Sequence, residues 1–216
     1  MTQKFCRTGL FLLMLLWLAG PALAADKPGK PAKPSSKDEV VTITTSQGII
    51  RLVLFDDTPL HKKNFLQKAK SGFYNGTTFH RVIPNFMIQG GDANSKDADP
   101  DNDGLGQPDA PTIPAELEPG HPHVYGAVAA ARMGGPRGTP SSYSQFYLVE
   151  NHDGTHFLDG QYTVFGQVIQ GLEVIDKIAN MPRDGRDRPT ADLKMTVKVE
   201  KLKRKKIAKL YGYKYA

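Results

Sequence analysis

The sequence predicts a mainly β protein, either a closed barrel or a sandwich, whose open ends are covered by two helices. Eight short segments carry alternating or continuous apolar residues, and most are separated by Gly, Pro or Asn turns, whereas only two segments have helical periodicity. The composition, 39% hydrophobic and 23% charged over 216 residues, is that of an ordinary globular protein. It excludes wholesale disorder, collagen and a multi-span membrane protein.

The expected strands are identified by apolar side chains that recur at every second residue. Val41 and Ile43 alternate with threonines, and after a Gln47-Gly48 turn apolar residues alternate again from Ile50 to Leu54. Such a period places one set of side chains on one face of a sheet. The eight expected strands are residues 40–44, 50–54, 78–82, 86–89, 125–131, 145–150, 163–168 and 195–199.

The two expected helices have start and stop signals or an apolar face. Thr58 is a suitable N-cap, Pro59 suits the first helical position, and the apolar stripe that follows ends at Ser71-Gly72. In residues 172–179 the apolar side chains fall on one face of a helix. Both helices are therefore expected to cover the open ends of the barrel or sandwich with their apolar faces.

Residues 1–24 have the features of a signal peptide. Lys4 and Arg7 form a basic start, Leu10–Ala19 is apolar, and the segment ends in the small-x-small pattern that signal peptidase cleaves. The apolar run is shorter than the about 20 residues that span a bilayer, and an uncleaved anchor is the alternative. Cleavage after Ala24 removes Cys6, the only cysteine. We therefore expect an exported protein, periplasmic or secreted.

The rest of the chain divides into three parts. Residues 25–38 are rich in Pro, Lys and Ser and have no large apolar side chain to bury, so a flexible linker is expected. Residues 39–202 hold the expected strands and helices and form the expected domain. Residues 203–216 are a basic C-terminal tail, for which two interpretations stay open: a solvated tail, or weak contact with an anionic surface such as lipid, peptidoglycan or an acidic partner.

The formal net charge of +6 is concentrated at the two ends. Of the 28 Lys and Arg residues, two lie in residues 1–24 and seven in residues 201–216, neither of which contains an acid. The middle therefore holds 19 basic and 22 acidic residues. A near-neutral body with a basic tail is a poor match to a nucleic-acid-binding domain, so we expect no nucleic acid partner. We expect a monomer.

The segment Phe79–Asp92 places polar side chains within an apolar run. Arg81 lies among apolar neighbours on an expected strand, and Phe86, Met87 and Gln89 precede a double glycine. An arginine beside a phenylalanine, a methionine and a glutamine indicates a polar anchor at an apolar pocket. Ordinary core packing with one paired arginine is the alternative.

This segment is joined by Phe73–Thr77, Ser144–Tyr147 and Phe157–Gly166, and the set resembles the cyclophilin family of peptidyl-prolyl cis-trans isomerases. The resemblance runs from about residue 40 to residue 202. It implies a closed eight-stranded antiparallel β-barrel capped by two α-helices, with a substrate groove on its outside. It also implies an enzyme that accelerates rotation of X–Pro bonds and requires no cofactor or metal.

The family's functional positions fall on eleven residues of this sequence. The resemblance implies that Arg81 is the catalytic arginine and that Gln89 helps to position it and the substrate. The positions that it implies for substrate binding are Phe86, Met87, Ala131, Arg132, Gln145, Tyr147, Phe157, Leu158 and Tyr162.

Three of these positions depart from the best-known eukaryotic pattern. Tyr147 stands in place of a phenylalanine, Phe157 in place of a tryptophan and Tyr162 in place of a histidine. Phe157 and Tyr162 resemble the exported bacterial branch, so we still expect activity. Cyclosporin is expected to bind poorly, because Phe157 lacks the indole N–H that would bond that drug. Tyr147 adds a hydroxyl group at the edge of the pocket.

We therefore expect an exported peptidyl-prolyl isomerase that assists the folding of proline-containing polypeptides. The alternative is a peptide-binding or chaperone module on the same barrel, with incidental catalysis. The pair Arg81 and Gln89 favours the enzyme, because a binding module has no need of a charge at the twisting bond.

Two further patterns are expected to hold no metal, with weak calcium binding as the alternative for the first. Residues 99–104 imitate the opening of a calcium loop, but Ala110 stands where that loop needs a bidentate glutamate. His121 and His123 have a spacing that a metal could use, as do His152 and His156, but the sequence offers no cysteine or carboxylate set beside them.

Overall fold

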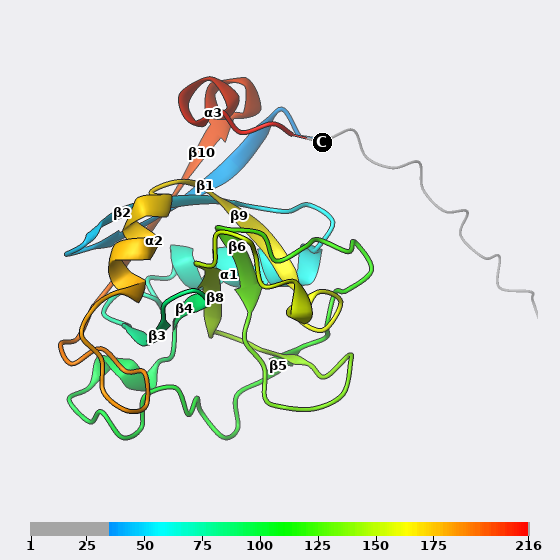
Figure 1. Ribbon diagram of the computed structural model, residues 1–216. Helices are drawn as coiled ribbons and strands as arrows, with labels where there is room; N and C mark the ends of the chain where they lie inside the picture. The colour runs from blue at the N-terminus through cyan, green and yellow to red at the C-terminus, as the bar shows by residue number, and fades with distance from the viewer. Residues whose placement is uncertain (1–34, 216) are drawn as a thin grey trace, which may run out of the picture. The chain divides into compact units, whose positions relative to one another are not determined.

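The structure, a computed structural model, describes residues 35–215. Its main element is a curled antiparallel sheet of eight strands in the order β10-β1-β2-β9-β6-β8-β4-β3, with helices packed on it (Figure 1). A mainly β fold with helices is confirmed. The strands are β1 (Lys37–Thr45), β2 (Gly48–Leu54), β3 (Phe79–Ile83), β4 (Met87–Gly90), β6 (Ala127–Ala130), β8 (Phe146–Val149), β9 (Val164–Gln170) and β10 (Thr196–Lys203).

All eight expected segments overlap strands of this sheet, but the first strand begins earlier than expected. Lys37 and Asp38 were expected in the flexible linker, yet in β1 they pair with Lys203 and Leu202 of β10. Backbone pairing with β10 and the ion pairs of the buried Asp38 explain the difference. The expected signal peptide, and residues 25–34 of the expected linker, lie outside the described residues.

The period-two pattern separates two faces of the sheet. One face forms the main core, in which side chains such as Val82, Ile88 and Leu148 are fully buried. The opposite face of the same strands carries Met87, Tyr147 and smaller residues, which form a second apolar cluster. This second cluster is the floor of the groove described below.

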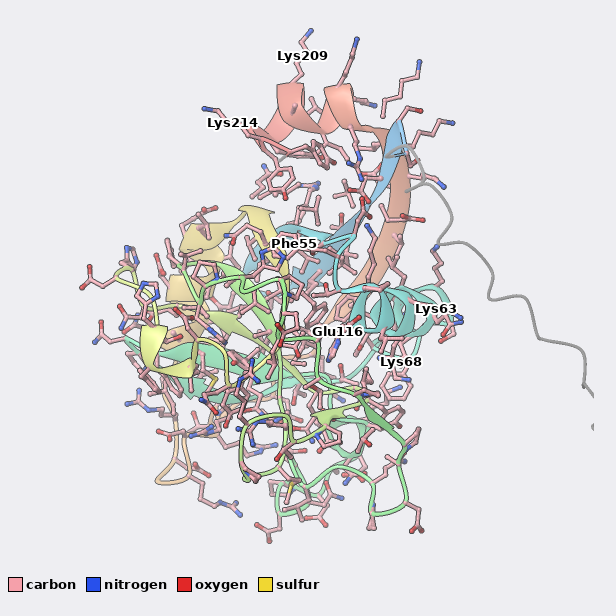
Figure 2. All side chains as sticks on the ribbon, turned by 90° about the vertical axis from the view of Figure 1, so that its right-hand side faces the viewer. Phe55, Lys63, Lys68, Glu116, Lys209 and Lys214 are labelled. Atoms are coloured by element: carbon pink, nitrogen blue, oxygen red, sulfur yellow. The ribbon has the colours of Figure 1, made fainter. Side chains whose placement is uncertain are left out.

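The two expected helices are confirmed as α1 (Pro59–Lys70) and α2 (Leu172–Ala179). Thr58, however, makes no capping hydrogen bond with its side chain. The carboxylate of Glu116 instead accepts the N–H groups of Leu60 and His61 at 3.0 and 2.9 Å, and its position beside α1 is visible in Figure 2. A residue remote in sequence therefore satisfies the free donors at this helix end.

The linear arrangement of the sheet leaves β3 and β10 at its two edges. The starts of these two strands are nevertheless joined by backbone hydrogen bonds. Met195 N–H, just before β10, donates to Thr77 C=O at 2.8 Å, and Phe79 N–H, at the first residue of β3, donates to Leu193 C=O at 3.1 Å. Thr78 and Lys194 form an isolated antiparallel bridge at the same place. Elsewhere, β5 (Thr112–Ile113) and β7 (Ser141–Ser142) pair and so connect the two long loops of the chain.

The basic tail is not simply a solvated segment. Residues Arg204–Tyr211 form a third helix, α3, which lies beyond the ends of β1 and β10 (Figure 1). Ile207 is fully buried in a small cluster with Val40 and Val53. Among residues 35–215, no helix is long and apolar enough to cross a membrane.

A group of four charged side chains fixes α3 to the sheet. Lys62 contacts both Asp38, at 2.9 Å, and Asp56, at 2.7 Å. Arg204, the first residue of α3, forms ion pairs with the same two carboxylates. Burial would raise the pKa of Asp56, but hydrogen bonds from Lys62 and Arg204 outweigh it and lower that pKa below its ordinary value. Breaking such a group leaves unpaired charge close to the core.

We predict that Ile207→Ala lowers the free energy of unfolding by about 2–4 kcal/mol, because Ile207 is fully buried and its loss leaves a cavity. In a domain of this size the melting temperature should fall by roughly 5–10 °C. The matched control is Leu210→Ala on the same helix, where the side chain is 55% exposed and little change is expected. Urea unfolding at pH 7 measures both variants. Equal stability of the two would contradict the packing of α3.

The burial of His80 on β3 predicts that the protein loses stability in acid. The residue is 5% exposed, and within residues 35–215 neither of its ring nitrogens has a hydrogen-bond partner. Burial lowers the pKa of His80 from 6.5 to about 4. The negative charge of Asp92 opposes this shift, and the positive charges of Arg81 and Arg188 add to it. The unfolded chain therefore binds the proton more readily, and stability falls as pH decreases from 6.5 towards 4.

Between pH 7 and pH 4.5 the free energy of unfolding should fall in both proteins, but by about 2 kcal/mol less in His80→Phe than in the wild type. Urea unfolding at the two pH values gives this difference. The control is Leu210→Phe, a change at a 55% exposed position that removes no titratable group. An unchanged pH dependence in His80→Phe would show that His80 does not titrate in this range.

Candidate active site

The strand register brings the expected catalytic residues into one row. Arg81 of β3 pairs with Gln89 of β4, Gln89 pairs with Tyr147 of β8, and Tyr147 pairs with Ala129 of β6. Residues paired directly across neighbouring strands point to the same face of the sheet. Three of the eleven expected positions, Arg81, Gln89 and Tyr147, therefore lie side by side on the outer face.

This row borders a hollow of about 120 Å³. Its walls combine apolar and aromatic side chains with the polar ends of Arg81, Gln89 and Arg132, which is typical of a site that binds one apolar group and its polar neighbours. The structure thus brings together nine of the eleven expected residues. They are Arg81, Phe86, Met87, Gln89, Ala131, Arg132, Tyr147, Leu158 and Tyr162.

Arg81 is exposed and forms no ion pair with any residue between 35 and 215. Its guanidinium group therefore keeps its donors available at the mouth of the hollow. Phe86 lies in the turn just before β4, and the C=O of Phe86 accepts the N–H of Glu150 at 2.9 Å. This turn holds the phenylalanine at the edge of the same hollow.

Gln145 lies outside the hollow and acts on it through Gln89. Its side-chain oxygen accepts a hydrogen bond from Gln89 at 2.9 Å, and its nitrogen donates to the C=O of Gly104 at 3.1 Å. Gln145 is buried, and it borders an adjoining pocket of about 340 Å³. It therefore fixes Gln89 and connects it to the loop that carries Gly104.

Phe157 also lies outside the hollow. Its side chain is 72% exposed on the short helix η2 (His156–Leu158), and it stacks on Phe86 with ring centroids 5.7 Å apart. The position is therefore at the rim of the groove, where a bound peptide longer than one residue would meet it. Leu158, the next residue, forms part of the wall itself.

Arg132 stiffens the far side of the groove. Its guanidinium group donates to the C=O groups of Met133, at 3.0 Å, and Gly135, at 3.1 Å. It also lies over the ring of Tyr162, 4.3 Å from the ring centroid. These contacts hold the start of the long loop 133–143 against the wall.

The hydroxyl of Tyr147 does not stand at the edge of the pocket, contrary to expectation. It lies 2.9 Å from Nε2 of His123, and both side chains are buried. The ring of Tyr147 therefore lines the hollow while its polar group is bonded behind the wall. Sequence reasoning missed this role of His123, because it considered that residue only as a metal ligand.

The four histidines with metal-like spacing each have a carboxylate beside them, which the sequence did not indicate. His121 contacts Asp57 and His152 contacts Asp176, whereas His123 and His156 share Asp159. Within residues 35–215, no three His, Cys, Asp or Glu side chains form a group that could hold a metal ion.

The fold and this groove, an apolar hollow beside a row of polar side chains, are those expected of an enzyme that acts on peptides. The chain belongs to the family of cyclophilin type peptidyl-prolyl cis-trans isomerases, whose model matches residues 40–199. Its reaction is therefore the cis-trans isomerisation of X–Pro peptide bonds.

Relatives and solved structures agree with this assignment. A peptidyl-prolyl cis-trans isomerase of Acinetobacter baylyi is 40% identical over 151 residues, which cover 66% of this chain and 73% of the relative. A peptidyl-prolyl cis-trans isomerase A of Dickeya dadantii is 40% identical over 157 residues, covering 70% and 76%. A cyclophilin type isomerase of Cryptosporidium parvum superposes with a TM-score of 0.66 at 27% identity, covering 76% of this chain and 98% of that protein.

Proposed function

We propose that this isomerase acts on exported proline-containing proteins and that Arg81 stabilises the twisted state of the X–Pro bond. The observation that carries the assignment of Arg81 is its position: an exposed guanidinium, without an ion pair among residues 35–215, beside Gln89 at the mouth of an apolar hollow. In support, the Cryptosporidium parvum cyclophilin was also crystallised in the presence of the dipeptide Ala-Pro.

The reaction requires no bond cleavage. An X–Pro amide rotates slowly because its C–N bond has partial double-bond character, with a barrier of about 18–20 kcal/mol. Conjugation is lost when the prolyl nitrogen becomes pyramidal and its lone pair localises. The planar, permanently charged guanidinium of Arg81 donates hydrogen bonds to that nitrogen or holds the prolyl carbonyl. Stabilising the twisted state by about 7 kcal/mol accelerates rotation about 10⁵-fold.

The other residues of the groove hold the two sides of the bond differently. Phe86, Met87, Tyr147 and Leu158 keep the proline ring still, while the residue before it swings. Gln89, itself held by Gln145, orients Arg81 and the substrate main chain. Because one chain supplies every wall of the groove, we propose that the enzyme works as a monomer.

Export is supported by the composition of residues 1–24 and by the resemblance of Phe157 and Tyr162 to the exported bacterial branch. The proposal places the mature enzyme in the periplasm or outside the cell. Mass spectrometry of the protein from its native host should give a chain that begins at or near Ala25. A chain beginning at Met1 or Thr2 in the membrane fraction would instead identify an anchored protein.

The outer side of α3 supports a weak contact with anionic lipid. Its lysines form no ion pair within residues 35–215, and Lys209 and Lys214 extend away from the sheet (Figure 2). The apolar side chain of Leu210 is 55% exposed among them. Each lysine near an anionic surface adds about 1 kcal/mol of attraction, so three or four suffice for weak binding.

Sedimentation with phosphatidylcholine vesicles, with and without phosphatidylglycerol, tests this contact. Replacing Lys205, Lys206 and Lys209 by Glu should abolish binding to the anionic vesicles. The matched control replaces the exposed Lys63, Lys177 and Lys194 by Glu, which changes the net charge equally at other places. Equal loss in both triple variants would assign the binding to net charge and not to α3.

We infer that the curled sheet closes into a barrel between β3 and β10. The backbone hydrogen bonds that join Met195 to Thr77 and Phe79 to Leu193 support closure. Hydrogen exchange tests it, since the amides of Met195 and Phe79 should then be protected as well as those of the central strands. Fast exchange of both would indicate an open edge.

A further inference from the structure

A chain of hydrogen bonds runs behind the apolar hollow. Asp159 Oδ1 accepts the backbone N–H of His123 at 2.7 Å and lies 2.8 Å from Nδ1 of the same residue. The other ring nitrogen of His123, Nε2, lies 2.9 Å from the hydroxyl oxygen of Tyr147. The His123 side chain is 0% exposed, so its ring nitrogens make these hydrogen bonds in place of hydrogen bonds to water.

The direction of these hydrogen bonds follows from chemistry. A carboxylate only accepts, so Nδ1 of His123 carries the proton and donates to Asp159. Burial lowers the pKa of His123 although Asp159 opposes it, and the ring is therefore neutral at pH 7. Its Nε2 is then an acceptor, and the hydroxyl of Tyr147 is the donor. Burial raises the pKa of Tyr147 well above its ordinary value, so that the hydroxyl keeps its proton.

This chain of hydrogen bonds ends at Tyr147 and starts beside Leu158, and both residues line the hollow. Tyr147 lines the hollow, and Leu158, the residue before Asp159, lines it as well. Nδ1 of His156 holds the second oxygen of Asp159 at 2.8 Å. Without an acceptor at His123, the hydroxyl of Tyr147 would be buried unpaired or would turn towards the space of the substrate ring.

We propose that His123 is a positioning residue of the isomerase, which acts by accepting the hydroxyl of Tyr147 and so holding the aromatic ring against the proline pocket. The proposal rests on the assignment of this hollow to the proline ring. It also explains how the ring of Tyr147 lines the pocket while its hydroxyl group is bonded elsewhere. His123 touches no substrate and acts through Tyr147 alone.

The test is the steady-state kinetics of a short X–Pro peptide with His123→Phe. The proline ring occupies the pocket in both the ground state and the twisted state, so a displaced Tyr147 weakens both equally. We expect KM to rise at least about fivefold, with kcat within about twofold of the wild type. A merely structural role would lower the amount of folded enzyme, and hence kcat, at unchanged KM.

Two rescue variants and a control sharpen the result. Adding Tyr147→Phe to His123→Phe removes the unpaired hydroxyl and should return KM to within about twofold of the wild type. His123→Gln offers an amide oxygen near the place of Nε2 and should also keep KM low. His152→Phe, a change at a 66% exposed histidine, should leave both constants unchanged.

The proposal is overturned if His123→Phe leaves KM unchanged, or if KM stays raised in the double variant. If His123→Phe alone does not fold, the double variant decides: a wild-type KM supports the proposal and a raised KM overturns it. Failure of the catalytic assignment is distinguishable, because it would appear as a normal kcat in Arg81→Ala, whatever the response of KM to His123.

Discussion

Arg81→Ala should lower kcat/KM for X–Pro peptides by at least about 10²-fold, because one preorganised donor aimed at developing charge contributes about 3 kcal/mol. The fold should survive, since Arg81 is exposed and forms no ion pair within residues 35–215 that its loss would break. Proline-limited refolding of a model protein and a peptide assay measure the activity, and urea unfolding measures the stability.

Two further variants show which property of the arginine matters. Arg81→Lys keeps the charge but loses the planar fork, so most of the activity should be lost with it. Arg186→Ala removes an arginine that is 60% exposed and paired with Asp101 outside the hollow, and it should leave activity unchanged. A folded Arg81→Ala enzyme with near-wild-type rates would refute the mechanism and favour a peptide-binding role for the groove.

The strands could be located from the sequence because each buries at least one face. Segment 50–54 lies in β2, where Ile50, Leu52 and Leu54 recur at every second residue and are buried. Segment 145–150 contains β8, whose four residues form a continuous apolar run and are all buried. Their order in the sheet depends on pairing between remote segments, such as β1 with β10, which periodicity does not encode. The resemblance of the motifs implied an eight-stranded antiparallel barrel but no strand order, which the structure supplies.

The elements that were missed depend on contacts remote in sequence. The apolar side of α3 is little more than Ile207 and Tyr211, and the helix is held by the ion pairs of Arg204 with Asp38 and Asp56. Similarly, Glu116 caps α1 from 55 residues away. No local pattern marks either arrangement. The sequence therefore predicted a basic tail, either solvated or in weak contact with an anionic surface, in place of α3, and it predicted Thr58 as the cap of α1.

The candidate site was likewise predictable in its motif residues and not in the contacts between remote segments. Motif residues that share one strand face, such as Arg81, Gln89 and Tyr147, meet as the resemblance implied. Their polar partners were not predictable: the hydroxyl of Tyr147 is satisfied by His123, which lies on a loop outside every motif. The roles of Gln145 and Phe157, behind and beside the hollow, likewise depend on loop positions that only the three-dimensional structure defines.

Phe157 lies where a change should alter inhibitor binding and leave catalysis almost untouched. Its ring is 72% exposed and stacks on Phe86 at the rim, whereas the hollow itself is lined by Met87, Tyr147 and Leu158. An inhibitor that extends over the rim contacts position 157, but the twisting bond does not. The resemblance to the cyclophilin family implies that cyclosporin is such a ligand and that it would profit from an indole N–H donor at position 157.

Cyclosporin should therefore inhibit this enzyme poorly, although the enzyme turns over proline peptides well. A missing hydrogen bond costs about 0.5–1.5 kcal/mol, and a buried acceptor left unpaired costs about 1–3 kcal/mol. Together they correspond to a loss of roughly ten- to hundredfold in affinity. Phe157→Trp should recover part of this loss with kcat/KM unchanged, as inhibition constants from the same peptide assay will show. Wild-type inhibition as tight as that of the tryptophan variant would mean that position 157 does not contact the drug.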